Sequence, residues 1–443
     1  MLKLEYIIYN IEYTIYENEK GGSMLKLKRI SVKNFKSFSN IDVYLRDLNL
    51  IIGANAGGKS NFIQILKFYS DAINYGLENA ISLQGGSQYI RNNNLKENNT
   101  SEFIFEFNFS KKVYRRNSNL KNIIKIKSLS NQFILNFNKR GDGFSVLSEV
   151  ITINFEEFAN ENNEGFTEQK IKEFSVNLER SKNKKSIKTK FIGVEDKEYL
   201  IEELIPPIEI IESLLNKDEL MVKYLILLIG IRGFLSQSFA VFDFDPKVLK
   251  KSSSVSAKYN LEEDGSNLSI CLNTVLKSQL NKRIFVDQLQ DMLPFISGIL
   301  TEKTLDKTML FKIKEGYSNS KYIPASLMSD GTVNIVAMIL ALYFDDRDFI
   351  VFEEPERNIH PGLLDKLLNK FYEMNSKKQI IITTHNPEII KHVKKDDIIF
   401  IKRNLHGFSE VKRIEELEHI QNFLDEEIGI DELYIDDILG GLF

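Results

Sequence analysis

The chain has 443 residues, of which 43% are hydrophobic and 27% are charged, a composition typical of a globular protein with two or three domains. Its net charge of −4 excludes a global basic field, so contact with nucleic acid would need a local patch. The single cysteine, Cys271, excludes an internal disulfide bond and indicates a reducing compartment, from which we expect a cytoplasmic protein.

The sequence gives no indication of a zinc-binding, membrane-spanning or secreted protein. The five histidines have no zinc-ligand spacing with Cys271. The most apolar run, residues 220–230, is short and contains Lys223, so we predict a buried helix and no membrane contact. Residues 1–23 lack the pattern of a signal peptide. Because Met24-Leu-Lys-Leu repeats Met1-Leu-Lys-Leu, we predict an N-terminal extension over 1–23 and a core that starts at Met24.

The first third of the core alternates short strands with one helix. A helix is predicted over 59–75, where Phe62, Ile65, Leu66, Tyr69 and Ile73 share one face. Residues 101–109 alternate aromatic and polar side chains, which predicts a half-buried antiparallel strand. Further strands are predicted at 25–33, 41–46, 48–52, 121–127, 132–137 and 149–155. We assign residues 24–155 to an N-terminal lobe.

The middle of the chain, residues 156–300, is predicted to be an inserted region. Residues 156–197 are polar and charged, which favours a loose hairpin or a mobile insertion. From residue 198 to about 300 the apolar period is helical, interrupted by a strand-like run at 239–244. No heptad pattern is sustained, so we expect no long coiled coil.

The last third, residues 301–443, alternates strands and helices and is predicted to be a C-terminal lobe. Strands are expected at 321–324, 348–352, 379–383 and 397–402, with helices from about 332, 361 and 387. This rhythm is typical of βα crossovers and a parallel sheet. The predicted fold class is therefore α/β, with a mixed sheet that combines a parallel core and an antiparallel β lobe.

A glycine-rich segment, Gly53-Ala-Asn-Ala-Gly-Gly-Lys59-Ser60, lies between a predicted strand and a predicted helix. It matches the pattern G-x-x-x-x-G-K-[ST], whose glycines let backbone N–H groups converge on a phosphate at a helix N-terminus. Lys59 can reach the β- and γ-phosphates, and the Ser60 hydroxyl can bind Mg²⁺. The segment therefore predicts a nucleoside triphosphate site.

Two further segments supply groups that triphosphate hydrolysis needs. The apolar strand 349–352 leads into Glu353 and Glu354, which could serve Mg²⁺ and the attacking water, respectively. A second apolar strand leads into Thr383-Thr384-His385, at the sheet edge where α/β proteins bind ligands. We therefore expect His385 to contact the γ-phosphate.

These motifs resemble those of the ABC-type ATPase heads of the RecF/SMC/OLD group, especially its compact "AAA" members. Residues 53–60 resemble Walker A, 349–354 Walker B, 356–361 the D-loop, and His385 the switch histidine. Ser329-Asp330-Gly331-Thr332 resembles the signature motif. Segments 261–268, 428–434 and 439–441 are also similar to family segments. The resemblance covers residues 24–140 and about 240–443.

The resemblance implies cofactors and partners. ATP and Mg²⁺ would bind through Gly53, Asn55, Gly58, Lys59, Ser60, Asn61, Lys36 and Ser37, with Ser60 and Glu353 at the metal. Two heads would form a homodimer in which Ser329, Asp330 and Gly331 of one chain cap the ATP of the other. Read locally, Ser329 is an ordinary helix N-cap and the turn with Lys36 and Ser37 is a solvated turn.

Three features depart from the family pattern. Glu353 stands where aspartate is commoner, and Met328 stands where leucine usually precedes the signature. No Q-loop residue is assigned, although Gln84 and Gln88 are candidates.

The leading hypothesis is an ATPase whose head dimerisation acts on DNA or on a nucleic-acid-processing partner, such as a separate nuclease or effector, in genome maintenance or anti-phage defence. A nucleotide-gated switch or scaffold with little turnover is the alternative. The signature and D-loop resemble the RecF/SMC side more than a transporter ATPase. Lysines and arginines at 111–116, 182–185 and 247–251 could form a strip that binds phosphates, although such runs are usually solvated loops.

Overall fold

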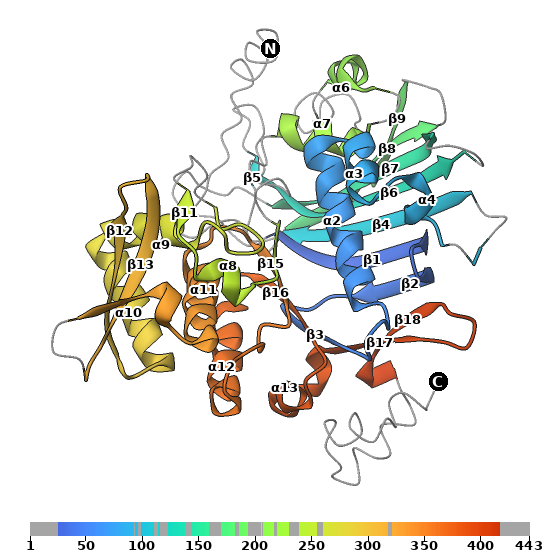
Figure 1. Cartoon of the computed structure of the whole chain (residues 1–443). Coiled ribbons are helices and arrows are strands. Elements are labelled where there is room, and N and C mark those ends of the chain that lie inside the picture. The colour runs from blue at the N-terminus through green and yellow to red at the C-terminus, as the bar shows by residue number, and fades with distance from the viewer. Residues whose placement is uncertain are drawn as a thin grey trace. The chain divides into compact units, whose positions relative to one another are not determined.

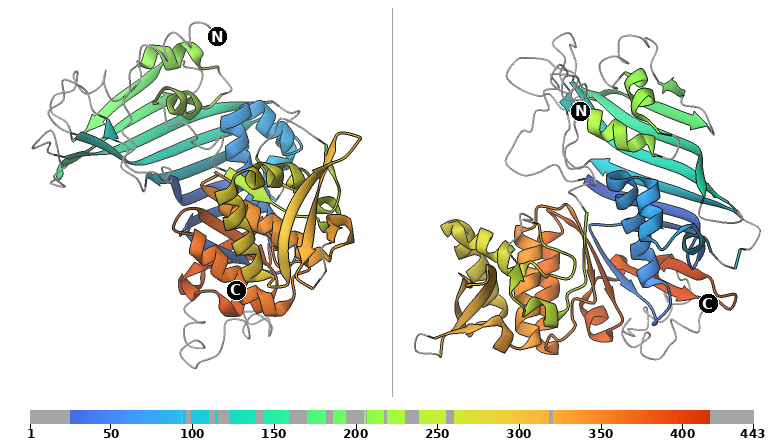
Figure 2. Two further views of the ribbon diagram at one scale, coloured as in Figure 1. Left: turned by 90° about the vertical axis from the view of Figure 1, so that its left-hand side faces the viewer. Right: turned by 45° about the horizontal axis from the view of Figure 1, so that its top comes forward.

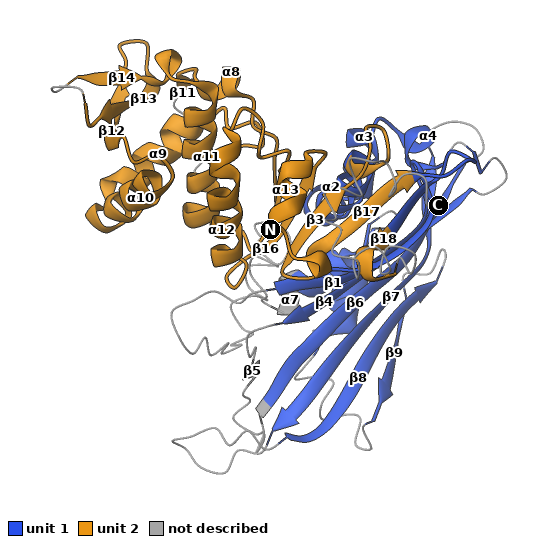
Figure 3. Cartoon of the chain, turned by 90° about the horizontal axis from the view of Figure 1, so that it is seen from below, with its two compact units in different colours: residues 1–45, 60–238, 403–411 blue, residues 46–59, 239–402, 412–443 orange. Residues whose placement is uncertain are grey.

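The computed structural model describes residues 25–92, 94–95, 99–109, 114–115, 123–138, 143–158, 170–181, 186–193, 205, 207–216, 219–229, 239–254, 260–317 and 321–416. The predicted extension over 1–23 and the tail segments 428–434 and 439–441 lie outside these residues. The chain divides into two compact units (Figure 3). Unit 1 comprises residues 1–45, 60–238 and 403–411, and unit 2 comprises residues 46–59, 239–402 and 412–443. The predicted lobe boundaries at 155 and 300 stay predictions.

Unit 1 contains a mainly antiparallel sheet with the strand order β18-β2-β1-β4-β6-β7-β8-β9. Each neighbouring pair is antiparallel except β18 and β2, which are parallel. The strands are β1 (Leu25–Phe35), β2 (Phe38–Tyr44), β4 (Thr100–Phe109), β6 (Ile123–Phe137), β7 (Phe144–Phe158), β8 (Lys170–Ser181), β9 (Ile187–Ile192) and β18 (Ser409–Arg413), with β5 (Tyr114–Arg115) pairing with β6.

Helix α2 (Lys59–Tyr75) lies across one face of this sheet (Figures 1 and 2). Its apolar face meets the inward-facing phenylalanines of β4: the Tyr69 and Phe105 ring centroids are 3.7 Å apart, and those of Phe68 and Phe103 are 5.3 Å apart. The predicted alternation of β4 and the predicted helical face thus pack against each other. The other helices of unit 1 are α3 (Leu77–Leu83), α4 (Ser87–Ile90), α6 (Ile208–Leu214) and α7 (Met221–Ile229).

The structure corrects one prediction in unit 1 and refines another. The strands expected at 121–127 and 132–137 form one continuous strand, β6. The charged segment expected to be a loose hairpin or a mobile insertion contains two regular antiparallel strands, β8 and β9, in agreement with the hairpin alternative. Its charges are compatible with a sheet because they pair across strands, as Lys172 does with Glu157 at 3.2 Å.

Unit 2 contains a wholly parallel run of strands with the order β10-β15-β16-β3-β17. These strands are β10 (Phe239–Phe242), β15 (Phe349–Glu353), β16 (Gln379–Thr384), β3 (Leu48–Ile52) and β17 (Ile398–Arg403). All residues of β3 and β16 are buried, as expected for a parallel sheet covered on both faces. The predicted fold class, a parallel core with an antiparallel β lobe, is confirmed.

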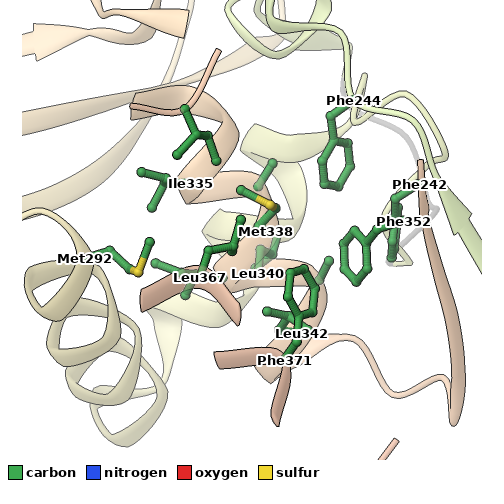
Figure 4. Packing of buried hydrophobic residues seen from close by; sticks show 14 of the residues in the cluster. Phe242, Phe244, Met292, Ile335, Met338, Leu340, Leu342, Phe352, Leu367 and Phe371 are labelled. Atoms are coloured by element: carbon green, nitrogen blue, oxygen red, sulfur yellow. The ribbon is translucent and has the colours of Figure 1, made fainter. Parts of the chain in front are cut away.

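Helix α11 (Asp330–Phe344) runs through the core of unit 2 (Figure 4). Its residues from Val333 to Leu342 are all buried, which fits a helix that is hydrophobic on every side. Phe352 of β15 packs among Phe242, Phe244 and Phe371 in the same cluster. The other helices are α8 (Pro246–Leu249), α9 (Leu268–Lys277), α10 (Gln279–Met292), α12 (Leu364–Met374) and α13 (Pro387–His392), with short 3₁₀ turns at 325–327, 361–363, 395–397 and 414–416.

Unit 2 also has a small antiparallel sheet of β11 (Ser253–Ser254), β12 (Ile296–Lys303), β13 (Thr308–Glu315) and β14 (Tyr322–Pro324). Of these four strands, only β14 is predicted from the sequence. Strand β18 of the larger sheet is not predicted either. The expected helix over 220–230 corresponds to α7. Within the described part of the chain, none of the helices has both the length and the apolar character to cross a bilayer.

Candidate nucleotide-binding site

The glycine-rich segment forms a tight turn between β3 and α2. A Cβ atom on Gly53 would lie 1.9 Å from the carbonyl oxygen of Ile401 on β17, so this position has no room for a side chain. The N–H of Gly57 donates to the Ala54 carbonyl at 3.0 Å. Ala56 and Gly58 have positive φ angles of 63° and 126°. The glycines therefore permit both the close approach to β17 and the backbone bend that turns back into α2.

The ammonium group of Lys59 folds back over this turn. Its Nζ donates to the carbonyl oxygens of Gly53 at 2.6 Å and Ala54 at 3.2 Å. The side chain is largely buried, and burial lowers the pKa of Lys59 while the charges of Glu354 and Glu356 oppose that shift. The lysine thus lies within electrostatic reach of two carboxylates, Glu354 and Glu356, that are about 300 residues further along the chain.

The strand order accounts for this proximity. In unit 2, β3, β16 and β15 are parallel neighbours, and their carboxyl ends share one edge of the sheet. Glu353 of β15 is in register with Thr383 of β16, and Thr384 is in register with Ile52 of β3. Ligands of α/β proteins bind at this kind of edge. The structure therefore brings the turn at 53–59 and the acids at 353–354 together, as the sequence predicts.

Glu354 has a strained backbone and two polar partners. Its φ angle is 43°, in the left-handed region that residues other than glycine rarely adopt and that is enriched at functional sites. Its carboxylate contacts Arg357 Nε at 2.8 Å and His385 Nδ1 at 2.7 Å. Burial alone would raise the pKa of Glu354, but hydrogen bonds from Arg357 and His385 hold it below its ordinary value. The structure thus joins Glu354 and His385.

Glu356 connects the ends of β15 and β16. The Thr384 hydroxyl donates to one oxygen of this buried carboxylate, and the Asn386 N–H donates to Thr384 Oγ1 at 2.9 Å. The other oxygen, Glu356 Oε2, is buried and has no hydrogen-bond partner among the residues that the structure describes. Burial raises the pKa of Glu356. These contacts hold the backbone on both sides of His385.

Four predicted nucleotide-binding residues belong to unit 1. Asn61 Nδ2 donates to Ser37 Oγ at 2.8 Å, so the turn at 34–37 lies beside the first turn of α2, which also carries Ser60. Lys36 has a positive φ angle of 48°, and burial lowers its pKa. Ser37 thus lies beside Asn61, and Lys36 belongs to the same turn.

The two Q-loop candidates also lie in unit 1 and differ in exposure. Gln84 is buried and donates to Gln64 of α2 at 3.0 Å, whereas Gln88 is exposed. The Q-loop assignment stays open.

The segment that resembles the signature begins helix α11 of unit 2. Ser329 is exposed and acts as the N-cap, accepting from the Thr332 N–H at 3.2 Å. Asp330 forms an ion pair with Lys250. A Cβ on Gly331 would lie 2.4 Å from the carbonyl oxygen of Asn358. The local interpretation of Ser329 as a helix cap is therefore correct, and its expected role across a dimer stays a prediction.

The basic strip is largely outside the described residues. Lys111, Lys112, Arg116 and residues 182–185 are not described, and Arg115 is described only as part of strand β5. Lys250 is occupied by its ion pair with Asp330. The strip stays a prediction.

The expected metal ligands are of the right chemical kind for Mg²⁺. Ser60 supplies a hydroxyl and Glu353 a carboxylate, and Mg²⁺ prefers oxygen ligands. Among the residues that the structure describes, no group of three or more His, Cys, Asp or Glu side chains could hold a metal ion. The two expected ligands, Ser60 and Glu353, fit the usual Mg²⁺ arrangement, in which one or two protein groups bind the ion together with phosphates and water.

Sequence reasoning missed two side chains at this site. Arg357 bridges Glu354 and Asp243, with its Nη1 2.9 Å from Asp243 Oδ1. Asp243 directly follows β10, the parallel neighbour of β15. The rule that pointed to Glu354, a polar residue after a buried strand, applies equally to Asp243 and could have found it.

The chain belongs to a known protein family of AAA-type ATPases. The family described as "AAA domain, putative AbiEii toxin, Type IV TA system" matches residues 48–391, which include every motif from the glycine-rich turn to His385. This membership confirms the predicted resemblance to compact AAA ATPases. No curated protein sequence matches the chain.

Similar solved structures include heads of SMC proteins. One is the SMC head bound to the C-terminal winged-helix domain of ScpA (14% identity, TM-score 0.44, covering 87% of this chain and 97% of that one). Another is the Pyrococcus furiosus SMC head with an extended coiled coil, bound to the C-terminal domain of ScpA (12%, 0.43, 91% and 100%). A third is the Thermotoga maritima SMC head (13%, 0.38, 88% and 98%).

Proposed function

We propose that this protein binds and hydrolyses ATP at the carboxyl edge of the parallel sheet in unit 2. The observation that carries the proposal is the placement of Lys59, Glu354 and His385 at one edge of this sheet, where His385 Nδ1 lies 2.7 Å from the Glu354 carboxylate. A lysine on a glycine-rich turn neutralises phosphate charge, and a nearby carboxylate can orient the attacking water. Each of the three side chains taken alone could serve only to stabilise the fold. Their position at one sheet edge supports a role in hydrolysis.

In this proposal each group has one task. Backbone N–H groups of the turn and Lys59 hold the phosphates, whose oxygens would compete with the Gly53 and Ala54 carbonyls for the ammonium group. His385 holds the Glu354 carboxylate. With ATP bound, Glu354 would accept a hydrogen bond from the attacking water and His385 would contact the γ-phosphate. Bound Mg²⁺, held by Ser60 and Glu353, would neutralise charge on the phosphates.

We further propose that two copies pair through their ATPase heads. The exposed N-terminus of α11, with Ser329, Asp330 and Gly331, would contact the ATP of the partner subunit. A helix N-terminus with free N–H groups suits the negative charge of a γ-phosphate. Hydrolysis would then separate the heads.

The process served by this cycle is proposed to be genome maintenance or anti-phage defence, through DNA or a separate nuclease or effector. The family description includes a putative toxin of a type IV toxin–antitoxin system, which agrees with a defence role. DNA binding can be tested with the variant in which Arg115, Arg116, Lys184 and Lys185 are neutralised. Salt-sensitive duplex binding that this variant loses would support the basic strip, and unchanged binding would exclude it.

The ATPase proposal is tested by the variant Glu354→Gln. Wild-type protein should release phosphate from Mg²⁺-ATP, whereas the variant should bind ATP but stall and accumulate as a dimer in light scattering. Glu302→Gln, at an exposed glutamate of β12, is the matched control and should behave as wild type. Full turnover in Glu354→Gln would require another residue to act as the base.

A nucleotide-gated switch with little turnover is the second candidate. It is favoured by one observation: Lys59 and Glu354 are both engaged by protein groups, the backbone carbonyls and Arg357, respectively. ATP-dependent dimerisation of the wild-type chain without phosphate release would support the switch over the ATPase.

A further inference from the structure

Arg357 forms a bridge between Glu354 and Asp243, which we call the Arg357 bridge. Its Nε lies 2.8 Å from Glu354 Oε2 and its Nη1 lies 2.9 Å from Asp243 Oδ1. The carboxylates come from the ends of two neighbouring parallel strands, β15 and β10. One guanidinium group therefore divides its donors between the proposed catalytic base and a second acid at the same edge of the sheet.

The bridge is accessible enough to rearrange. The side chains of Arg357 and Asp243 are 47% and 44% exposed, whereas that of Glu354 is 18% exposed. Ion pairs between exposed groups contribute little free energy and exchange with water. The guanidinium can thus shift between its two partners at small cost. Such a shift would change how strongly Glu354 is held.

The backbone of Arg357 is tied to the helix that carries the signature-like segment. Asn334 of α11 is buried and donates through Nδ2 to the Arg357 carbonyl at 2.8 Å. The next carbonyl, that of Asn358, lies against Gly331 with no space for a Cβ atom. A displacement of the first turn of α11 therefore has to move the backbone on which Arg357 stands, because both contacts are close-packed.

We infer that Arg357 is a positioning residue that restrains Glu354 in the single chain and releases it when the N-terminus of α11 engages a partner subunit. The inference rests on the proposed function. While Arg357 holds Glu354 Oε2 and His385 holds Oε1, neither carboxylate oxygen is fully available to a water molecule. Transfer of the guanidinium toward Asp243 would free Oε2. Arg357 acts through Glu354 and need not touch the nucleotide.

The test compares steady-state ATP hydrolysis by variants of the full chain. Arg357→Gln should raise kcat about two- to fivefold at low protein concentration with little change in KM, since a partly exposed ion pair to Glu354 is removed. Asp243→Asn should lower kcat, because Arg357 then binds Glu354 alone. Arg357→Lys should retain part of the restraint. Arg283→Gln, at an exposed ion pair of α10, is the control and should match wild type.

Two further measurements separate this role from others. Wild-type turnover per chain should rise with protein concentration, whereas Arg357→Gln should depend on it less. In a Glu354→Gln background, the Arg357→Gln change should have no effect on residual turnover. A loss of kcat in Arg357→Gln, a change confined to KM, or an effect that persists in the Glu354→Gln background would overturn the inference.

The outcomes distinguish this inference from the proposed function. Wild-type hydrolysis that Glu354→Gln abolishes, combined with an Arg357→Gln variant indistinguishable from wild type, overturns the inference alone. A wild-type chain that does not hydrolyse ATP overturns both.

Discussion

Gly331 lies against the carbonyl oxygen of Asn358, at a distance that leaves no room for a side chain on Gly331. The contact joins the start of α11 to the segment that follows β15, although the two residues are 27 positions apart in the sequence. Asn358 itself has a positive φ angle of 62°. A glycine here is therefore explained by packing within one chain, whatever it contacts in an assembly.

The first prediction concerns this contact. Gly331→Ala places a Cβ atom 2.4 Å from Asn358 O, so backbone must shift, at a cost of about 1–3 kcal/mol in the free energy of unfolding. Gly316→Ala is the control, since its Cβ would lie 3.6 Å from Phe295 O, an ordinary contact. Urea unfolding of both variants measures the difference. Equal stabilities of the two variants would mean that the Asn358 carbonyl can move away from the added methyl group at no cost.

Removal of the Lys59 ammonium group should weaken nucleotide binding. Lys59→Ala should reduce ATP affinity by about 10- to 100-fold, the range expected when a hydrogen-bonded charge is lost. Isothermal titration with Mg²⁺-ATP measures the change. Lys377→Ala, at an exposed lysine of unit 2, should bind normally. Retained affinity in Lys59→Ala would contradict the phosphate-binding role of the turn.

The stability of unit 2 should depend on the ionisation of Glu356. Burial raises its pKa above the ordinary 4.5, so the folded chain binds this proton more tightly than the unfolded chain. Its contribution to stability is therefore present below pH of about 4.5 and is lost as the pH rises through the folded pKa. The Glu356→Gln variant cannot ionise at this position, so its stability should not show this decrease as the pH rises.

Urea midpoints of wild type and Glu356→Gln, measured from pH 4 to pH 8, check this sign. As the pH rises, the urea midpoint of Glu356→Gln should increase relative to that of the wild type. A constant difference would mean that folding leaves the pKa of Glu356 unchanged, and a difference that moves the other way would show that its surroundings stabilise the carboxylate.

In unit 1, Glu149 of β7 should stabilise helix α7. Its buried carboxylate accepts from the N–H groups of Met221 at 2.6 Å and Val222 at 3.0 Å. Glu149→Ala would leave these N–H groups without this acceptor, at about 1–3 kcal/mol for each buried group that stays unsatisfied. Urea unfolding measures the loss. Glu209→Ala, in the exposed first turn of α6, should change stability by less than about 0.5 kcal/mol.

Local patterns were sufficient to predict several elements of this fold. Helix α2 occupies the predicted range 59–75 because its apolar period and the glycine turn before it are both readable within a few residues. The alternation at 101–109 likewise identified β4. Segment 156–197 was predicted only as a loose hairpin or a mobile insertion. The regularity of β8 and β9 was not predicted because their charges pair with residues on neighbouring strands, as Lys172 does with Glu157.

In the candidate site, too, some features follow from local sequence and others depend on the tertiary structure. The sequence by itself determined that the turn at 53–60, the acids at 353–354 and His385 follow strands, which places them at one edge if those strands are parallel. Only the tertiary structure decided that Arg357 contacts both Glu354 and Asp243 and that Asn358 abuts Gly331. Such pairs depend on strand order and on the packing of α11, and these are set by contacts between residues far apart in the chain, which no local pattern records.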